Sequence, residues 1–209
     1  MSVPPERPGR LVLATRNRHK VAELRRILTA EGVAVELVDL DDLPDVPDVA
    51  ETGATFAENA LLKARAVAAA TGLPAAADDS GLCVDALAGM PGVLSARWAG
   101  RHGDDRANLE LLLDQLAEVP DGRRGAQFVC AAALVVPGGA ERVVEGRLAG
   151  TLTRAPRGSG GFGYDPIFVP VGETRTTAEL TPEEKDAVSH RGRAFRALAP
   201  VVGLLVPAP

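Results

Sequence analysis

The order of strand-like and helix-like segments predicts an α/β domain. A short apolar run at 10–14 breaks into a polar loop, and residues with helical spacing follow from Val21. A second strand is expected at 34–38, and an acidic, proline-punctuated segment at 39–48 predicts a surface loop. A third short strand at 75–77 follows an alanine-rich helix. Strands that alternate with helices are typical of α/β proteins.

Capping signals predict where the next two helices begin. Thr55, with Glu58 three residues later, predicts the start of the alanine-rich helix, and Gly72 predicts its end. Asp104 or Asp105 can cap a later helix. The core face of that helix is marked by the spacing of Leu109, Leu112, Leu113 and Leu116.

The C-terminal half continues the alternation. Residues 127–136 and 142–153 predict a long antiparallel strand pair around a glycine-containing turn. Thr181 and Pro182 predict the start of a short helix, and Ser189 predicts the cap of another that runs through Leu198.

Length and composition predict one soluble domain. The chain has 209 residues, 46% of them hydrophobic and 24% charged, which is ordinary for a globular protein of this size. We expect a single, two-lobed domain at 10–205 after a flexible N-terminus at 1–9. The proline-containing end from Val206 is also expected to be loose.

Charge and cysteine content limit the partners and the compartment. Cys83 and Cys130 lie in apolar neighbourhoods and no secretory segment precedes them, so a reducing cytoplasm is expected. No apolar run approaches the length of a membrane span, which predicts no membrane partner. The net charge of -5 argues against binding to nucleic-acid backbones.

Three lysines stand out in a chain with twenty arginines. Lys20, Lys63 and Lys185 all lie in or near segments that are dense in reactive side chains, a pattern that suggests a nucleotide with a metal ion. The loop at 15–20 joins a strand to a helix N-terminus, where backbone N–H groups attract an anion. The loop lacks the Walker A pattern, and an ordinary capped helix start explains the same residues.

The segment Asp78–Gly81 follows the short strand at 75–77 and predicts a magnesium site at its end. Glu51 can supply a further oxygen if the chain folds back, and one aspartate can activate a water molecule. The alternative is an acidic turn in solvent.

A glycine-rich segment at 158–166 contains Phe162 and the only tyrosine, Tyr164. An aromatic ring on such a loop can stack on a nucleobase, although rings tucked into the core are the rival interpretation. Further along, Lys185 and the Ser189–Arg191 segment provide mainly hydrogen-bond donors. Donors favour a base with keto oxygens over one with an amino group, although a charged helix face has the same composition.

Taken together, these motifs resemble those of the inosine triphosphate pyrophosphatase family. The resemblance extends from Arg10 to about Leu204, in the family's order, through Leu13–Lys20, Glu51–Ala60, Asp78–Leu82, Pro91–Arg97, Gly161–Pro166 and Ser189–Arg191. It implies an elongated mixed β-sheet with flanking helices in two lobes around a central cleft, and a homodimer.

The resemblance also implies roles by position. The triphosphate would be held by Thr15, Arg16, Asn17, Arg18, His19, Lys20 and Lys63. Magnesium would be bound by Glu51 and Asp79, and Asp79 with Asp78 would activate the attacking water. The base would be seated by Phe162, Gly163, Tyr164 and Asp165, in a pocket completed by Ser80, Lys185, His190 and Arg191.

The implied reaction is hydrolysis of ITP, dITP or XTP to the nucleoside monophosphate and pyrophosphate, which removes these nucleotides from the cellular pool. The chain departs from the family at Arg16, where glycine is frequent, at His19, where glycine or lysine is frequent, and at Ala50, where many relatives carry a second acidic residue.

Two alternatives differ in substrate or in class. A Maf-type pyrophosphatase acting on pyrimidine or modified nucleotides shares the general architecture, but the donors of Ser189–Arg191 argue against it. The second alternative is a nucleotide sensor without turnover, and the intact Asp78 and Asp79 pair argues against a sensor.

Overall fold

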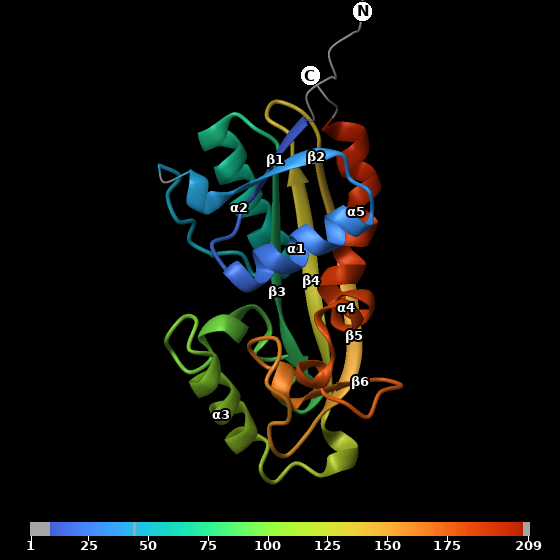
Figure 1. Cartoon of the computed structure of the whole chain (residues 1–209). Coiled ribbons are helices and arrows are strands. Elements are labelled where there is room, and N and C mark those ends of the chain that lie inside the picture. Colours follow the sequence, from blue (N-terminus) through green and yellow to red (C-terminus); the bar gives the residue numbers. More distant parts are fainter. Residues whose placement is uncertain (1–8, 44, 207–209) are drawn as a thin grey trace, which may run out of the picture. The chain divides into compact units, whose positions relative to one another are not determined.

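The computed structural model describes residues 9–43 and 45–206, which form a six-stranded sheet with flanking helices (Figure 1). The strands are β1 (Gly9–Leu13), β2 (Val35–Asp39), β3 (Ala75–Val84), β4 (Gly125–Val135), β5 (Glu141–Leu152) and β6 (Phe168–Pro170). The α-helices are α1 (Arg18–Ala30), α2 (Phe56–Thr71), α3 (Asp105–Gln115), α4 (Pro182–Val188) and α5 (His190–Leu205).

The sheet is mixed, with the strand order β2-β1-β3-β4-β5-β6. β1 pairs in parallel with both β2 and β3, whereas β5 and β6 are antiparallel. The predicted α/β class with a mixed sheet is therefore confirmed.

Two compact units divide the chain, and the chain passes between them several times. Unit 1 contains the described residues up to Asp79, then 131–144 and the residues from Ala194 onward, and unit 2 contains 80–130 and 145–193. The unit boundary falls inside β3, so Asp79 and Ser80 are adjacent in the chain but belong to different units.

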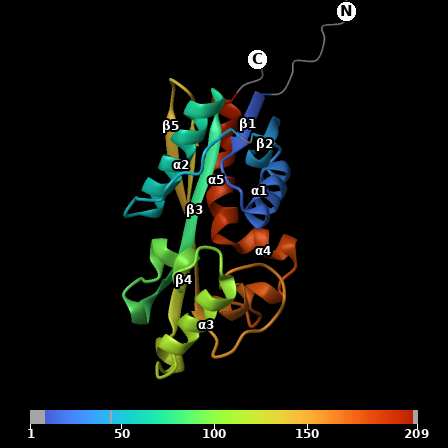
Figure 2. The ribbon, with the colours of Figure 1, turned by 90° about the vertical axis from the view of Figure 1, so that its left-hand side faces the viewer.

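In unit 1, β1 lies between β2 and β3, and the chain leaves β1 first toward β2. The chain then returns from β2 past β1 to β3, and right-handed crossovers in opposite directions place their helices on opposite faces. Figure 2 shows α1 and α2 on opposite sides of β1. One face packs against α2 through Val12, Ala60, Ala64, Ala75 and Ala77. Because side chains alternate along a strand, the neighbouring leucines of β1 point to the α1 side.

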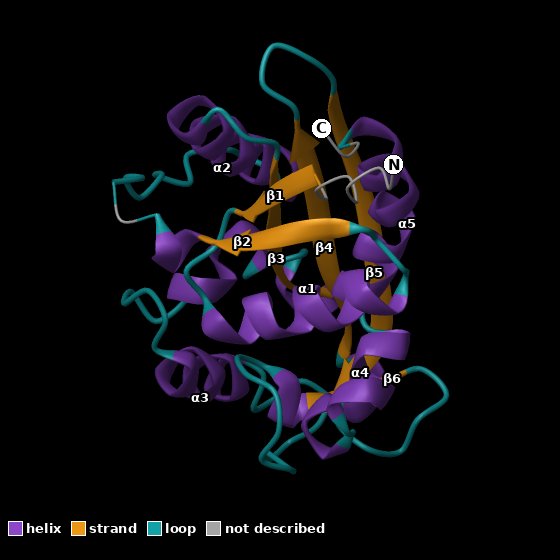
Figure 3. Cartoon of the chain, turned by 45° about the horizontal axis from the view of Figure 1, so that its top comes forward, coloured by secondary structure: helices purple, strands orange, loops and turns teal. Residues whose placement is uncertain are grey.

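The predicted start of α2 is confirmed, whereas α1 begins at Arg18, inside the predicted loop at 15–20. The Asn17 side chain accepts hydrogen bonds from the backbone N–H groups of His19 and Lys20 at the start of α1. Thr55 caps α2 by accepting from Glu58 N, and Gly72 ends the helix with a φ of 68°. β4 and β5 are joined by a short turn at 136–140, which Figure 3 shows as the loop between two neighbouring strands.

Unit 2 has its own hydrophobic core around α3, whose cap is Asp104. The core combines Leu82 and Val84 of β3, the leucines of α3, and Phe128, Tyr164 and Phe168. A fully buried arginine, Arg124, donates from its guanidinium to the backbone oxygens of Leu116, Leu152 and Thr153, at 2.7 to 2.9 Å. α4 begins at Pro182 as predicted, and Thr181 and Glu184 form a capping box at its start.

The structure shifts several predicted boundaries, and the ends of β3 and α5 move furthest. β3 runs to Val84 instead of ending before Asp78, because apolar residues resume at Leu82. α5 begins after Ser189, as predicted, but continues to Leu205. Gly9 already belongs to β1.

The predicted flexible residues 1–8 lie outside the described part of the chain, as do 207–209. In residues 9–43 and 45–206, no helix is both long enough and apolar enough to cross a membrane.

Candidate active site

Two adjacent carboxylates inside β3 face two different helices of unit 1. Asp78 Oδ2 lies 3.0 Å from Lys20 Nζ on α1, and Asp79 Oδ1 lies 3.5 Å from Lys63 Nζ on α2. This division follows from strand alternation, because α1 and α2 lie on opposite sides (Figure 2). The acidic turn in solvent is therefore excluded: Asp78 and Asp79 are 1% and 6% exposed.

Lys63 joins Asp79 to a third carboxylate. Its ammonium lies 2.8 Å from Glu51 Oε1, so one cation bridges two acidic side chains. Burial raises the pKa of Asp79, and the nearby Glu51 raises it further, while Lys63 opposes the shift. Burial lowers the pKa of Lys63, but the surrounding carboxylates outweigh burial and leave it raised. The site therefore favours a positive charge at this position.

Glu51 and Asp79 have the donor chemistry of a magnesium site. In residues 9–43 and 45–206, no group of three or more His, Cys, Asp and Glu side chains is arranged to hold a metal ion. Mg²⁺ commonly takes only one or two carboxylates and completes its shell with water and phosphate oxygens. The ammonium group of Lys63 already lies between Glu51 and Asp79. The two carboxylates therefore fit a magnesium ion that also binds phosphate oxygens.

Asn59 is a site residue that the sequence interpretation missed. Its side chain is fully buried on α2, where Nδ2 donates to Asp79 Oδ2 at 3.0 Å and Oδ1 accepts from Gly53 N at 2.7 Å. Asn59 and Lys63 are four residues apart and share one face of the helix. An asparagine within the alanine-rich, core-facing stripe was the signal that could have identified it.

The loop at 15–20 is organised mainly by its own hydrogen bonds. Asn17 Oδ1 is occupied in capping α1, and Thr15 Oγ1 accepts from Asn17 N at 3.2 Å. His19 is exposed on the first turn of the helix. The loop therefore presents a capped helix start with Lys20 beside Asp78. Its role in binding phosphate stays a prediction.

Arg16 contacts the acidic loop instead of pointing to the carboxylates of β3. Its guanidinium donates to Asp48 Oδ1 at 3.0 Å, to Val46 O at 2.7 Å and to Leu40 O at 3.3 Å. These contacts use three of the five N–H donors of the guanidinium, and the phosphate role of Arg16 stays a prediction. Arg16 holds the segment that precedes Glu51.

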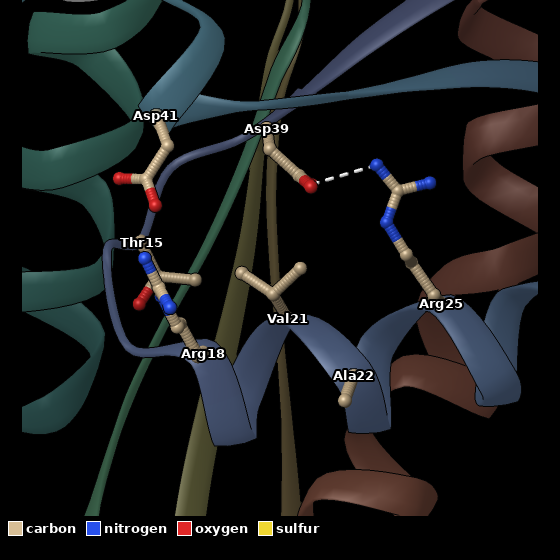
Figure 4. Close-up of a pocket in the computed structure, with 7 residues that line it drawn as sticks. All are labelled: Thr15, Arg18, Val21, Ala22, Arg25, Asp39 and Asp41. Atoms are coloured by element: carbon tan, nitrogen blue, oxygen red, sulfur yellow. Dashed lines mark hydrogen bonds and ion pairs between the residues drawn. The ribbon is translucent and has the colours of Figure 1, made fainter.

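Arg18 and Thr15 line a pocket of about 340 Å³ on α1 (Figure 4). Val21 and Ala22 contribute its apolar part, and the other lining residues are Arg25, Asp39 and Asp41. Arg25 forms an ion pair with Asp39 at 2.8 Å, drawn as a dashed line in Figure 4. Arg18 thus lines this pocket, whereas Lys20 pairs with Asp78.

In unit 2, Asp165 organises the predicted base-binding residues. Its Oδ2 accepts from Lys185 Nζ at 2.6 Å and from Phe162 N at 2.8 Å, and its Oδ1 accepts from Thr177 Oγ1 at 2.8 Å. A Cβ at Gly161, where φ is 70°, would collide with the Asp165 carboxylate. Asp165 is 3% exposed, so a buried carboxylate holds Lys185, Phe162 and Thr177 in place.

Two cations flank the ring of Phe162. Lys185 Nζ lies 4.9 Å and Arg191 Cζ 5.5 Å from the ring centroid, within the range of cation–π contacts. Arg191 also donates to Ser80 Oγ at 2.7 Å, and His190 stacks on Phe128 with ring centroids 4.7 Å apart. The structure therefore brings together these predicted base-site residues of unit 2.

Tyr164 differs from its predicted role. It is 4% exposed, its ring belongs to the core of unit 2, and its hydroxyl donates to Ser95 O at 2.8 Å. A ring packed in this way is not available to stack on a base, so the rival interpretation of core packing holds for Tyr164. Gly163 contributes a backbone N–H that donates to Asp105 Oδ2 at 2.9 Å.

Comparisons with known proteins show which proteins this chain is similar to. A dITP/XTP pyrophosphatase from Streptomyces coelicolor is 69% identical over 193 residues, which cover 92% of this chain and 96% of the relative. A crystal structure of a nucleoside-triphosphatase, dITP/XTP pyrophosphatase, from Mycobacterium abscessus is 63% identical, with a TM-score of 0.74 over 91% of this chain and 99% of that one.

A Ham1 protein from Coxiella burnetii is 43% identical, with a TM-score of 0.83 over 92% of this chain and 98% of that one. The model of the Ham1 family matches residues 11–201. These matches confirm the family resemblance drawn from the motifs, and the chain belongs to the Ham1 family.

Proposed function

We propose that this chain is a nucleoside triphosphate pyrophosphatase that hydrolyses dITP, XTP and ITP to the monophosphate and pyrophosphate. The relatives named dITP/XTP pyrophosphatase support the reaction class. The observation that carries the proposal is the buried cluster in which Lys63 bridges Glu51 and Asp79. This cluster combines a carboxylate that can act as a base with charges suited to a polyphosphate.

The phosphate end of the substrate is assigned to unit 1. Lys20 and Lys63 are compact cations beside the carboxylates of β3, and the N–H groups at the start of α1 add the positive end of a helix dipole. A triphosphate that binds here replaces carboxylate contacts of the lysines with phosphate contacts.

Asp79 is the proposed general base. Its carboxylate takes a proton from water, the water oxygen forms a bond to the α-phosphorus, and the bond from that phosphorus to the bridging oxygen breaks. Pyrophosphate leaves with the bridging oxygen, and the nucleoside monophosphate carries the oxygen of water. The contact of Asp78 with Lys20 suits it to positioning that lysine.

Magnesium is part of the proposal, with Glu51 and Asp79 as its protein ligands. When bound, the ion offsets negative charge on the phosphate oxygens. Ala50, the neighbour of Glu51, has no side-chain oxygen, so Glu51 and Asp79 are the proposed protein ligands in this chain.

The base end is assigned to unit 2. Lys185 and Arg191 present donors beside the ring of Phe162, and hypoxanthine and xanthine offer keto oxygens as acceptors. Adenine has an amino group at the corresponding position and would leave a donor facing a donor, which costs affinity. Asp79 and Ser80 are consecutive in β3, so the phosphate-end and base-end groups are linked directly by the chain.

The wider biological predictions rest on the family resemblance and, for the compartment and nucleic acid, on the cysteine content and the net charge. We infer a role in removing deaminated purine nucleotides from the cellular pool, a cytoplasmic location and a homodimeric state. No nucleic acid is expected as a partner, since the net charge is -5.

Product analysis tests the proposal directly. Purified protein is incubated with Mg²⁺ and either dITP, ITP, XTP, GTP, ATP or TTP, and pyrophosphate is scored against orthophosphate. We expect pyrophosphate from dITP, ITP and XTP, little from ATP, whose base carries the amino group, and none when EDTA replaces magnesium. Orthophosphate as the main product, or silence on every nucleotide, would contradict the proposed activity, and silence with retained binding would favour a sensor.

Replacing Asn59 with alanine is expected to lower kcat by about 10- to 100-fold, the usual range for a residue that orients a ligand of a metal. The change removes the donor to Asp79 Oδ2 and the acceptor of Gly53 N. The measurement is kcat on dITP well below the melting temperature, with the folded fraction checked by circular dichroism. A wild-type kcat in a folded Asn59→Ala protein would show that Asn59 serves stability alone.

A further inference from the structure

The loop that carries Phe162 is held by contacts from a distant part of unit 2. We call residues 158–165 the base loop. Within it, Gly163 N donates to Asp105 Oδ2 at 2.9 Å, and the Tyr164 hydroxyl donates to Ser95 O at 2.8 Å. Two consecutive residues directly after Phe162 are therefore fixed by the segment at 92–105.

That segment is itself anchored, so it can act as a support. Ser95 Oγ accepts from Leu82 N of β3 at 2.9 Å. Asn108, on α3, is 1% exposed and accepts from Ala99 N at 2.7 Å. Hydrogen bonds from both a central strand and a helix thus hold the segment against the core.

Asp105 contributes a side chain that α3 does not need for its cap. The capping oxygen is that of Asp104, which accepts from Ala107 N at 3.1 Å. Asp105 Oδ2 instead reaches 58 positions along the chain to Gly163. The charge of Asp105 also reaches Tyr164: burial raises the pKa of the tyrosine, and the carboxylate raises it further.

Gly163, which receives the Asp105 contact, is a residue type with a flexible backbone. Gly163 has a φ of 60°, in the left-handed region, and follows the residue whose ring lies against Lys185 and Arg191. A charge-assisted bond to its N–H restricts this turn and limits the positions that the ring of Phe162 can take.

We propose that Asp105 is a positioning residue for base recognition, which fixes Gly163 and so keeps Phe162 against the cations of the base site. In this role the Asp105 carboxylate acts through the N–H of Gly163. This inference rests on the proposed function, because it assigns the base loop to the nucleotide base.

The test compares Asp105→Ala with Asp104→Ala, its neighbour and matched control, on dITP. Loss of the Asp105 contact is expected to raise KM about tenfold, the effect of losing one hydrogen bond to a charged group. kcat should stay within about twofold of the wild-type value, because the phosphate groups are held in unit 1. The lost contact would weaken binding of the substrate and of the transition state equally. Asp105→Asn keeps a side-chain oxygen and should restore most of the wild-type KM.

Asp104→Ala is expected to show the opposite pattern. It removes the helix cap and should lower the melting temperature by a few degrees, as loss of a cap usually does, with KM unchanged. Equal KM values for Asp105→Ala and the wild type would overturn the inference. A KM increase of the same size in both alanine variants would also overturn it, because general destabilisation of α3 would then explain the effect.

Hydrogen exchange separates this inference from the proposed activity. In the substrate-free protein, peptides that cover 158–165 should exchange faster in Asp105→Ala than in the wild type or in Asp104→Ala. If these peptides exchange at the wild-type rate in Asp105→Ala, the positioning role is overturned, even if the protein is active. If the wild type hydrolyses no nucleotide, the proposed function and the role in base recognition both fail, whereas the exchange result still tests the contact.

Discussion

Replacing Asp79 with asparagine is expected to lower kcat on dITP about 1000-fold, since a positioned general base typically contributes 10²- to 10⁴-fold. The substitution preserves the shape of the side chain but removes its ability to take a proton from water. Nucleotide binding should persist within about tenfold, because the donors of the base site and Lys20 are unchanged. Steady-state kinetics and a calorimetric titration with dITP measure the two quantities.

The control for this prediction is Asp121→Asn, the same substitution at a side chain that is 79% exposed and pairs with Arg154. It should leave kcat at the wild-type value. An Asp79→Asn protein that retains more than about a tenth of the wild-type kcat would move the general base to another residue, with Asp78 as the first candidate.

Replacing Arg124 with methionine is expected to destabilise the protein by about 3 kcal/mol, because three backbone oxygens would lose a buried donor. The guanidinium of Arg124 joins the end of α3 to the end of β5, through Leu116 O, Leu152 O and Thr153 O. For a chain of this size the change corresponds to a fall of about 10 °C in Tm. Thermal unfolding followed by circular dichroism measures it.

Arg154→Met provides the matched comparison. Arg154 also donates to backbone oxygens, those of Ala117 and Val119, but its side chain is 54% exposed. Water can replace its contacts, so we expect a loss of at most about 1 kcal/mol. Equal shifts in Tm for Arg124→Met and Arg154→Met would show that burial does not set the contribution of Arg124 to stability.

Local signals in the sequence predicted the elements that depend on neighbouring residues. Thr55 with Glu58, Gly72, and Thr181 with Pro182 each fix a helix boundary through contacts within one or two turns. The crossover from β1 to β2 likewise follows from a short apolar run and a helical stripe. Such features could be predicted because the interacting groups are close in the chain.

Features that depend on distant groups could not be predicted in this way. The strand β3 continues through Asp78 and Asp79 because Lys20 and Lys63, from two different helices, pair with the buried carboxylates. The acceptors of Arg16 lie 24 to 32 positions further along the chain, and no local pattern indicated them. Asn59 and Asp105 were missed for the same reason, since their partners Asp79 and Gly163 are distant in sequence.

The position of bond cleavage is the most direct test of the account, because it reports which phosphorus the activated water attacks. Hydrolysis of dITP is run to completion in water enriched in ¹⁸O, and both products are analysed by mass spectrometry. The account predicts one ¹⁸O atom in the monophosphate and none in pyrophosphate. Label in pyrophosphate, or in orthophosphate released from the γ position, would contradict attack at the α-phosphorus and the role assigned to Asp79.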